Sequence, residues 1–410
     1  MLLPNGTHLT YCTNIHPGEN WEDVFASLKT YLPKLKKQLS PDAQFGVGLR
    51  LSNLASQELL ISDNLPAFKN WLDAEGLYVF TMNGFPYGGF HHQEVKDAVH
   101  KPDWTTQNRL AYTIRLAYIL AELIPEGMEG GISTSPLSYK PWLGFNKERF
   151  KEVFEVSALH LAMVTEELLF LKESKGKTIH LDIEPEPDGL LENSQEVIHF
   201  YQKWLLYIGC KRLACTKGLS PDDAVTALLN HIRVCYDVCH FALAYEQPHE
   251  AFAKLQAAGI QIGKIQLSSA LKAELPESEV ARTELARKLQ PFAESTYLHQ
   301  VVERNGNGQL HFYSDLPQAL HHIQKPTARE WRTHFHVPLF TQNYNGLQST
   351  QDDVETVLNY ISEHPELSQH LEVETYTWEV LPEGLKTDLT TSIARELEWV
   401  LQQIQIKENA

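Results

Sequence analysis

Short runs of β-branched and apolar residues alternate with longer amphipathic stretches along this chain of 410 residues. The amphipathic stretches have helical spacing; in Trp21–Leu39 the apolar residues recur every three or four positions. This alternation favours parallel strands joined by helices. The strand-like runs are LTYCTNI (9–15), FGVGLRL (45–51), LYVFTMN (77–83), GISTSPL (131–137), TIHLDIE (178–184), IRVCYDV (232–238), KIQLSS (264–269) and LEVETYTW (371–378).

We therefore predict an α/β fold in which eight βα units close into a (β/α)8 TIM barrel. An open, doubly wound sheet is the alternative, but no early strand is followed by a G-x-G-x-x-G turn. No Gly/Ser-rich linker divides the chain, so residues 1–410 are expected to form a single domain. The expected helices are 21–39, 107–123, 150–173, 196–208, 221–230, 251–258, 277–293 and 354–364.

One segment between the seventh and eighth predicted strands, about residues 295–345, breaks the alternation. It contains HQVVERNGNGQLHFYSD, in which NGNG separates two β-like runs, and this pattern predicts a β-hairpin. A short helix and the stretch RTHFHVPLF follow. Because the loops after barrel strands surround the active site, we expect this insertion to reach it.

The formal net charge of −17 limits the range of partners. Contact with phosphate groups needs a surplus of Lys and Arg, so nucleic acid and anionic membrane surfaces are not expected. The stretch MLLPNGTHLTYC does not resemble a signal peptide, and no apolar run of about 18 residues occurs. We expect no membrane insertion and a cytoplasmic location. The five cysteines, an odd number, do not suggest a disulfide framework, and Cys235 and Cys239 are expected to be small buried side chains.

Polar side chains stand at the carboxyl ends of the later strands, where a barrel carries its chemistry. Carboxylates that converge there repel one another unless a proton or a cation intervenes. Their mixture of carboxylate, amide and imidazole suits Mn²⁺, Mg²⁺ or Zn²⁺ as a cofactor. The candidate metal ligands are Glu184, Asp237, His240, Gln266, His334, His336 and Glu374.

Each motif has a plain structural explanation when it is taken alone. The D-x-x-H pair of VCYDVCH is often an ordinary hydrogen-bonded couple, EPEP a rigid turn, and HFH a strand with histidines facing solvent. The ordered set, with each group on its own βα unit, is more specific, and it favours a metal site.

Further polar and aromatic residues near strand ends are candidates for substrate binding. His16 could instead cap the first helix, and Arg50 could bind a substrate carboxylate or phosphate or pair with a neighbouring acid. Asn83 and Tyr87 would line a polar pocket or belong to a structural loop. Trp378 would form a pocket wall, with core packing as the alternative.

The D-x-x-H strand resembles that of the xylose isomerase-like and endonuclease IV-like TIM barrels, in which both residues bind metal. Glu184 resembles the bridging Glu of that superfamily, and Glu374 resembles its final-strand Glu. HFH resembles the Asp-x-His pair of the third metal site of endonuclease IV, with His334 where the Asp would be. Gln266 departs from the pattern, because it stands where a metal-binding His is usual. The early strands also lack the histidines of endonuclease IV, which puts a trinuclear zinc centre in doubt.

A second resemblance extends almost from end to end. The blocks YCTNIHPGENW, TMNGFPYGGFH, STSPLSYKPW, LDIEPEPDG, YDVCHFAL, HFHVPLF and VETYTWEVLP are similar to the EboE family of metabolite traffic proteins. That resemblance implies a sugar isomerase-like TIM barrel in a pathway that processes and exports a small metabolite, with transient contacts to other proteins of the pathway. It supplies no reaction.

Three functions remain open. In a metal-dependent isomerase or epimerase of a sugar- or cyclitol-like metabolite, an ion would polarise a substrate carbonyl. The resemblance implies that Glu184 and Glu374 would then move a proton, with His240 assisting. In a phosphoesterase-type hydrolase, the three histidines would hold a second ion. In a non-catalytic carrier, Gln266 would mark lost chemistry.

Overall fold

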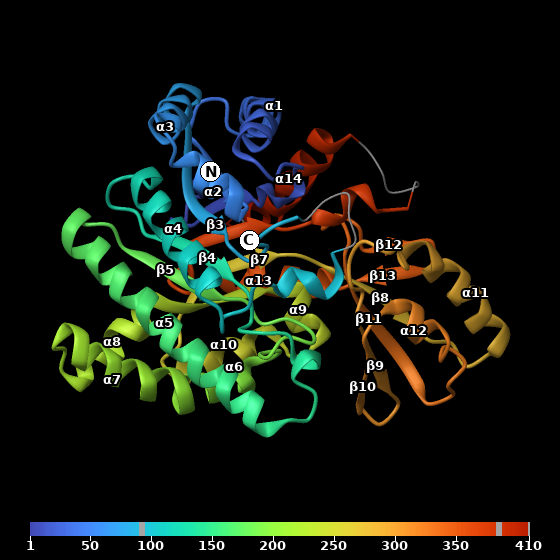
Figure 1. Cartoon of the computed structure of the whole chain (residues 1–410). Coiled ribbons are helices and arrows are strands. Elements are labelled where there is room, and N and C mark those ends of the chain that lie inside the picture. Colours follow the sequence, from blue (N-terminus) through green and yellow to red (C-terminus); the bar gives the residue numbers. More distant parts are fainter. Residues whose placement is uncertain (90–94, 383–387, 409–410) are drawn as a thin grey trace.

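The computed structural model describes residues 1–89, 95–382 and 388–408, and its centre is a barrel of eight parallel strands (Figure 1). Neighbouring strands follow the order β1-β14-β7-β6-β5-β4-β3-β2. This arrangement confirms the predicted (β/α)8 barrel. The strands are β1 (His8–Tyr11), β2 (Phe45–Arg50), β3 (Leu77–Asn83), β4 (Gly130–Thr134), β5 (Ile179–Ile183), β6 (Ile232–Asp237), β7 (Ile262–Leu267) and β14 (His370–Val373).

The barrel is nearly closed between β1 and β2. Only one backbone bridge, from Cys12 to Gly48, is formed there among the described residues. Threonine side chains complete the junction, because the Thr10 hydroxyl donates to the Gly46 carbonyl at 2.8 Å and the Arg50 amide donates to the Thr13 hydroxyl at 2.9 Å. The first strand is shorter than the predicted range 9–15, because β1 ends at Tyr11 and residues 13–15 form a 3-10 turn.

Helices surround the barrel, and their apolar faces pack against the strands (Figure 1). The first, α1, begins after Asn20, whose side chain accepts the Asp23 amide at 2.9 Å. The outer helices are α1 (Trp21–Leu39), α2 (Asn53–Leu59), α3 (Asn64–Glu75), α4 (Gln107–Leu123), α5 (Lys147–Lys175), α6 (Ser194–Phe200), α7 (Leu206–Lys217), α8 (Pro221–His231), α10 (Pro248–Ala257), α13 (Gln351–Glu363) and α14 (Leu389–Glu408). The short helix α9 (Val238–Leu243), which follows β6, is fully buried.

The insertion between β7 and β14 is confirmed, and it is larger than a hairpin. It holds an antiparallel sheet in the order β10-β9-β11-β8-β13-β12, which lies beside the barrel (Figure 1). The predicted helix 277–293 belongs to this insertion as α11, and α13 takes the seventh helix position of the barrel. The insertion comprises β8 (Ala270–Glu274), α11 (Glu279–Leu289), β9 (Val301–Asn305), β10 (Leu310–Tyr313), α12 (Leu316–Leu320), β11 (Ala328–His336), β12 (Asn343–Tyr344) and β13 (Leu347–Ser349).

The barrel interior is polar, whereas branched apolar side chains usually fill such barrels. At its middle, the Lys264 ammonium lies 2.8 Å from a Glu372 carboxylate oxygen, and both side chains are fully buried. Gly48 is required opposite this pair, because a Cβ there would lie 2.0 Å from the other Glu372 oxygen. The Lys264–Glu372 ion pair separates the two mouths of the barrel.

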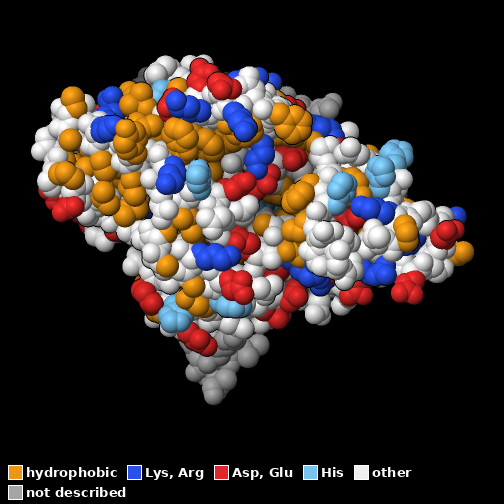
Figure 2. All heavy atoms as spheres, turned by 90° about the horizontal axis from the view of Figure 1, so that it is seen from below, with side chains coloured by type: hydrophobic (Ala, Val, Ile, Leu, Met, Phe, Trp, Pro, Cys, Tyr) orange, Lys and Arg blue, Asp and Glu red, His pale blue; other side chains and the backbone are white. Residues whose placement is uncertain are grey.

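The outer surface carries hydrophobic side chains over the α5–α8 side of the molecule (Figure 2). Val156, Leu159, Trp204, Tyr207 and Ile208 contribute to a groove of about 300 Å³ there. Within the described part of the chain, every helix is too short or too polar to cross a bilayer.

Candidate metal centre

Three carboxylates meet at the carboxyl-terminal mouth of the barrel, which we call the upper mouth. Glu184 follows β5, Asp237 ends β6, and Glu374 follows β14. Each offers one oxygen such that all three oxygens lie within 4.8 Å of one another, and all three residues are buried. The structure therefore brings together groups that are far apart in the sequence, as the strand-end argument predicted.

Among the described residues, no Lys or Arg forms an ion pair with Glu184, Asp237 or Glu374. One oxygen of Glu184 and one of Asp237 are buried without a hydrogen-bond partner. Burial raises the pKa of Glu184 and of Glu374 well above the usual range, and repulsion from the neighbouring carboxylates raises both further. Orphaned carboxylate oxygens at this spacing fit a divalent cation.

Neighbouring side chains hold the carboxylates in place. The Asn14 and Asn83 side-chain amides donate to one Glu374 oxygen at 2.9 and 3.0 Å. The Ser268 hydroxyl donates to Asp237 at 2.7 Å, and the His240 amide donates to the same oxygen at 3.0 Å. These bonds leave the second oxygen of each carboxylate available to a ligand.

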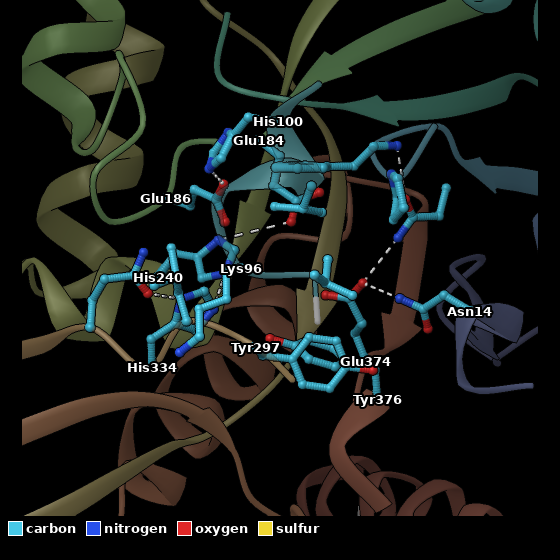
Figure 3. Close-up of a pocket in the computed structure, with 17 residues that line it drawn as sticks. Asn14, Lys96, His100, Glu184, Glu186, His240, Tyr297, His334, Glu374 and Tyr376 are labelled. Carbon is cyan, nitrogen blue, oxygen red and sulfur yellow. Dashed lines mark hydrogen bonds and ion pairs between the residues drawn. The ribbon is translucent and has the colours of Figure 1, made fainter. Parts of the chain in front are cut away.

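Three histidines, His240, His334 and His336, form a second group beside the carboxylates, and Figure 3 shows His240 and His334. The Nδ1 atom of His240 lies 3.0 Å from the Pro185 carbonyl, and that of His336 lies 2.5 Å from the Glu374 carbonyl. Because a carbonyl oxygen only accepts, both Nδ1 atoms carry the proton. Nδ1 of His334 lies 2.9 Å from the Gln300 side-chain oxygen and donates in the same way.

This tautomer leaves the Nε2 lone pair of each histidine free of hydrogen. The Nε2 atoms of His240 and His334 lie 3.1 Å apart, and Nε2 of His336 is buried without a partner. Burial lowers the pKa of all three imidazoles, so the rings are neutral and their Nε2 atoms carry no proton. Two lone pairs at that distance repel one another unless a cation lies between or beside them. An Nδ1–H held by a carbonyl is also the usual support of a metal-binding histidine.

The remaining predicted ligand, Gln266, lies beside these groups. It is fully buried and pairs in register with Asp237 across β6 and β7. Its side-chain oxygen accepts the Cys235 thiol at 3.1 Å, and its nitrogen has no partner. The thiol contact occupies one lone pair of the oxygen that would bind a metal.

Of the five predicted substrate-binding residues, only Asn83 lines the cavity. His16 bonds to the Tyr11 hydroxyl at 2.8 Å, and Arg50 donates to the Gly88 carbonyl at 2.7 Å. Tyr87 packs against Tyr112, and Trp378 packs against Phe340. Each of these four side chains contacts other protein groups and does not line the cavity.

The cavity at the upper mouth measures about 70 Å³. Its wall includes three residues that the sequence did not single out as site residues. Glu186 follows Glu184 in EPEP, and a carboxylate oxygen of Glu186 lies 3.1 Å from Nε2 of His100. Burial raises the pKa of Glu186 well above the usual range and lowers that of His100 to about 3. Gln300 sets the tautomer of His334. Of these three residues, only Glu186 had a signal in the sequence, which is the repeated Glu-Pro of EPEP.

Aromatic side chains also line this cavity. Tyr297 from the insertion and Tyr376 after β14 meet edge to face, with ring centroids 5.0 Å apart (Figure 3). Lys96, on the opposite loop, forms an ion pair of 2.7 Å with Asp315 of the insertion. The insertion thus contributes to the wall of the site, as predicted.

Comparisons with known proteins are limited to structure. No family model matches the chain, and no curated protein matches its sequence. A xylose isomerase-like TIM barrel protein from Mycobacterium smegmatis, in complex with magnesium, is 11% identical; the match covers 98% of each chain with a TM-score of 0.50. This chain therefore has the xylose isomerase-like TIM barrel fold.

Two further solved structures are similar at lower scores. A D-tagatose 3-epimerase-like protein is 12% identical, and the match covers 98% of this chain and 100% of that one with a TM-score of 0.49. The IOLI protein with a bound zinc atom is 11% identical, and the match covers 97% of each chain with a TM-score of 0.45.

Proposed function

We propose that this protein is a metal-dependent isomerase or epimerase of a small polyhydroxylated metabolite, of the sugar or cyclitol type. The observation that carries the proposal is the buried Glu184–Asp237–Glu374 cluster, whose ligand oxygens all lie within 4.8 Å of one another. The fold is also that of the magnesium complex described above, which supports a divalent ion here.

In this proposal the three carboxylates hold a hard ion such as Mg²⁺ or Mn²⁺. When bound, the ion supplies Lewis-acid polarisation of a substrate carbonyl. Glu184 and Glu374 both line the cavity, and burial raises the pKa of each, which makes each carboxylate a stronger base than one in water. One would remove a proton beside the carbonyl and the other would return it. His240 lies 3.9 Å from Glu184 and would orient a substrate hydroxyl.

The test is exchange of carbon-bound hydrogen. The protein with Mn²⁺ is incubated in D₂O with a panel of ketoses, aldoses and inososes, and NMR detects deuterium beside the carbonyl. Glu184→Gln and Glu374→Gln should each abolish the exchange, whereas the exposed control Glu363→Gln should retain it. Lack of exchange in every substrate, with release of phosphate from phosphoesters instead, would refute the isomerase.

A phosphoesterase-type hydrolase is the second candidate, and the Nε2 lone pairs of His240 and His334, which lie 3.1 Å apart, favour it. In this proposal His240, His334 and His336 supply nitrogen ligands of the kind that Zn²⁺ prefers. Nitrogen atoms of His240 and His336 lie within 4.8 Å of an Asp237 oxygen, so Asp237 could serve both positions. Two bound ions about 3.5–4 Å apart would favour hydrolysis, and one would favour isomerisation. Anomalous scattering at the metal edges measures this number.

The pathway assignment rests on the sequence blocks alone. Membership of the EboE family, a role in metabolite processing and export, transient partners from that pathway and a cytoplasmic location all stay predictions. The assignment of residues 1–410 to a single domain and the absence of a nucleic-acid partner also stay predictions. The carrier alternative predicts binding of a polyol without hydrogen exchange and without metal.

A further inference from the structure

A groove lies between α3 and α4, two helices on the outside of the barrel (Figure 1). It measures about 640 Å³, and none of its lining residues also lines the cavity at the upper mouth. Leu60, which follows α2, and Lys175, the last residue of α5, complete its walls. The groove is therefore a surface feature that is separate from the metal centre.

Arg115 of α4 lines this groove, and only part of its guanidinium group is occupied. Its Nη1 atom donates to the Asn53 side-chain oxygen at 2.9 Å and to the Ser56 hydroxyl at 3.1 Å. Both acceptors are neutral groups of α2, and they fix the position of the guanidinium plane. The Nε and Nη2 atoms have no protein partner among the described residues, and both are reachable by solvent. One edge of the guanidinium group is thus held in place and left open.

The groove is locally cationic, although the chain has a formal net charge of −17. Arg115 and Lys69 both line it, and neither forms an ion pair with an acidic residue of the described ranges. The third cation, Lys175, is paired with Glu122, which is the one carboxylate in the lining. Burial lowers the pKa of Arg115, as expected for a guanidinium group that is partly removed from water. Two cations of the groove therefore lack an anion of their own.

Apolar side chains lie beside these cations. Leu60 is 46% exposed, Pro66 is exposed, and Leu65 and Tyr118 are half-buried. The hydroxyl of Tyr118 is already occupied, because it donates to a Glu167 carboxylate oxygen at 2.7 Å. Single exposed apolar residues need no explanation, but a group of them along one groove is typical of a binding surface. A ligand that fits both parts has an anionic head and an apolar body.

We propose that this groove binds a small aliphatic monocarboxylate, with its carboxylate on Arg115 and its chain against Leu60 and Leu65. The free Nε and Nη2 atoms present two parallel N–H donors, which match the two oxygens of a carboxylate. Lys69 adds a second positive charge, and the leucines remove the alkyl chain from water. This site does not depend on the function of the upper mouth.

The test is isothermal titration calorimetry with octanoate, with 1-octanol as the neutral match and butanoate as the short match. We expect saturable binding of octanoate and none of octanol. Butanoate should bind at least about tenfold more weakly, because it buries four fewer methylene groups. Arg115→Gln should weaken octanoate at least about tenfold, because it removes the charge and the paired donors. The control Lys34→Gln, which changes an exposed lysine of α1, should leave the affinity unchanged.

Two results of this titration would overturn the proposal. One is equal affinity of the wild-type protein and Arg115→Gln for octanoate. The other is equal affinity of the wild-type protein for butanoate and octanoate, which would mean that the apolar side of the groove is not used.

A second measurement decides the matter if Arg115→Gln does not fold. Lys69→Gln changes an exposed residue, should fold normally and should weaken octanoate severalfold. Crystals soaked with 8-bromooctanoate should show anomalous scattering from bromine in the groove. Bromine found only at the upper mouth would refute the proposal. So would a wild-type protein that binds no octanoate and dissociates from a dimer on Lys69→Gln, because a second copy would then occupy the groove.

Discussion

The two mouths of the barrel both gather buried carboxylates and histidines, but their spacing differs. At the upper mouth, oxygens of Glu184, Asp237 and Glu374 lie within 4.8 Å of one another, and the imidazoles beside them meet at 3.1 Å. At the opposite, amino-terminal end of the barrel, the lower mouth, the Asp182 carboxylate and the imidazoles of His180 and His370 surround Gly131. The insertion contributes to the wall of the upper mouth, whereas loop residues form the rim of the lower one.

Both mouths combine carboxylates with imidazoles, but in the described part of the chain only the upper mouth brings such groups within 4.8 Å of one another, so spacing rather than residue type marks the candidate metal site. Carboxylates at close range repel strongly and are relieved by one compact, doubly charged ion. The Lys264–Glu372 ion pair keeps the two environments apart, because it occupies the barrel axis between them. Four predictions test this comparison, from the largest expected effect to the smallest.

Replacing Lys264 by Met should remove the ion pair between the two mouths, and it should lower the free energy of unfolding by the largest amount of the four. The change leaves the Glu372 carboxylate buried without its cation, which typically costs about 3–5 kcal/mol of unfolding free energy. Urea denaturation followed by circular dichroism measures it. The control Lys254→Met breaks an exposed pair with Glu246 and should cost less than about 1 kcal/mol. Similar costs for both variants would show that the buried pair has no special role.

Asp237→Ala should lower the affinity of the upper mouth for Mn²⁺ by at least about 100-fold, because it removes a direct ligand. Elemental analysis after dialysis against a fixed Mn²⁺ concentration measures this change. Asp182→Asn, at the lower mouth, is the matched control and should leave Mn²⁺ affinity within about twofold. If Asp237→Ala retained full metal occupancy, the assignment of the site would be wrong.

His336→Ala should separate the two positions within the upper mouth. It removes an imidazole nitrogen that lies within 4.8 Å of ligand atoms of Asp237 and His240, so affinity for Zn²⁺ at the nitrogen-rich position should fall by roughly 10–100-fold. Mn²⁺ at the carboxylate position should remain. Anomalous difference maps at the zinc and manganese edges distinguish the two outcomes. Loss of both metals together would mean that the positions are one site.

The pH dependence of metal-induced stabilisation should be the smallest effect. The folded-state pKa values of Glu184 and Glu374 are raised, so the metal-free protein binds these protons more tightly than the unfolded chain does. Their contribution to metal-free stability is therefore present near pH 4.5 and is lost as pH rises through the raised values. Metal binding displaces these protons. For each proton, the displacement costs about 1.4 kcal/mol for every pH unit below the raised pKa.

The gain in melting temperature on adding Mn²⁺ should therefore be larger at pH 8 than at pH 5. Differential scanning calorimetry with and without the ion gives this gain at each pH. Glu184→Gln, which cannot titrate, should show a flatter dependence. A gain that is independent of pH in the wild-type protein would show that these carboxylates do not bind the metal.

Residues at strand ends could be predicted from the sequence with good accuracy. The barrel topology turns a position in the chain into a position at one rim, so Glu184, Asp237 and Glu374 meet as expected. Loop residues could not be placed in this way. Arg50 and Tyr87 looked like pocket residues, but Arg50 is held by the Gly88 carbonyl and Tyr87 packs against Tyr112. His100 gave no local signal, and only the folded loop brings it to Glu186.

The alternation of strand-like and helical segments by itself determined the barrel, the position of the insertion and the rim at which the later acidic residues gather. It did so because hydrophobic periodicity and strand direction are local properties that add up along the chain. Only the tertiary structure decided which lone pairs are left without a partner, since a tautomer depends on carbonyls contributed by distant loops. The same reason explains why the lower mouth, with its histidines on β5 and β14, was visible only after folding.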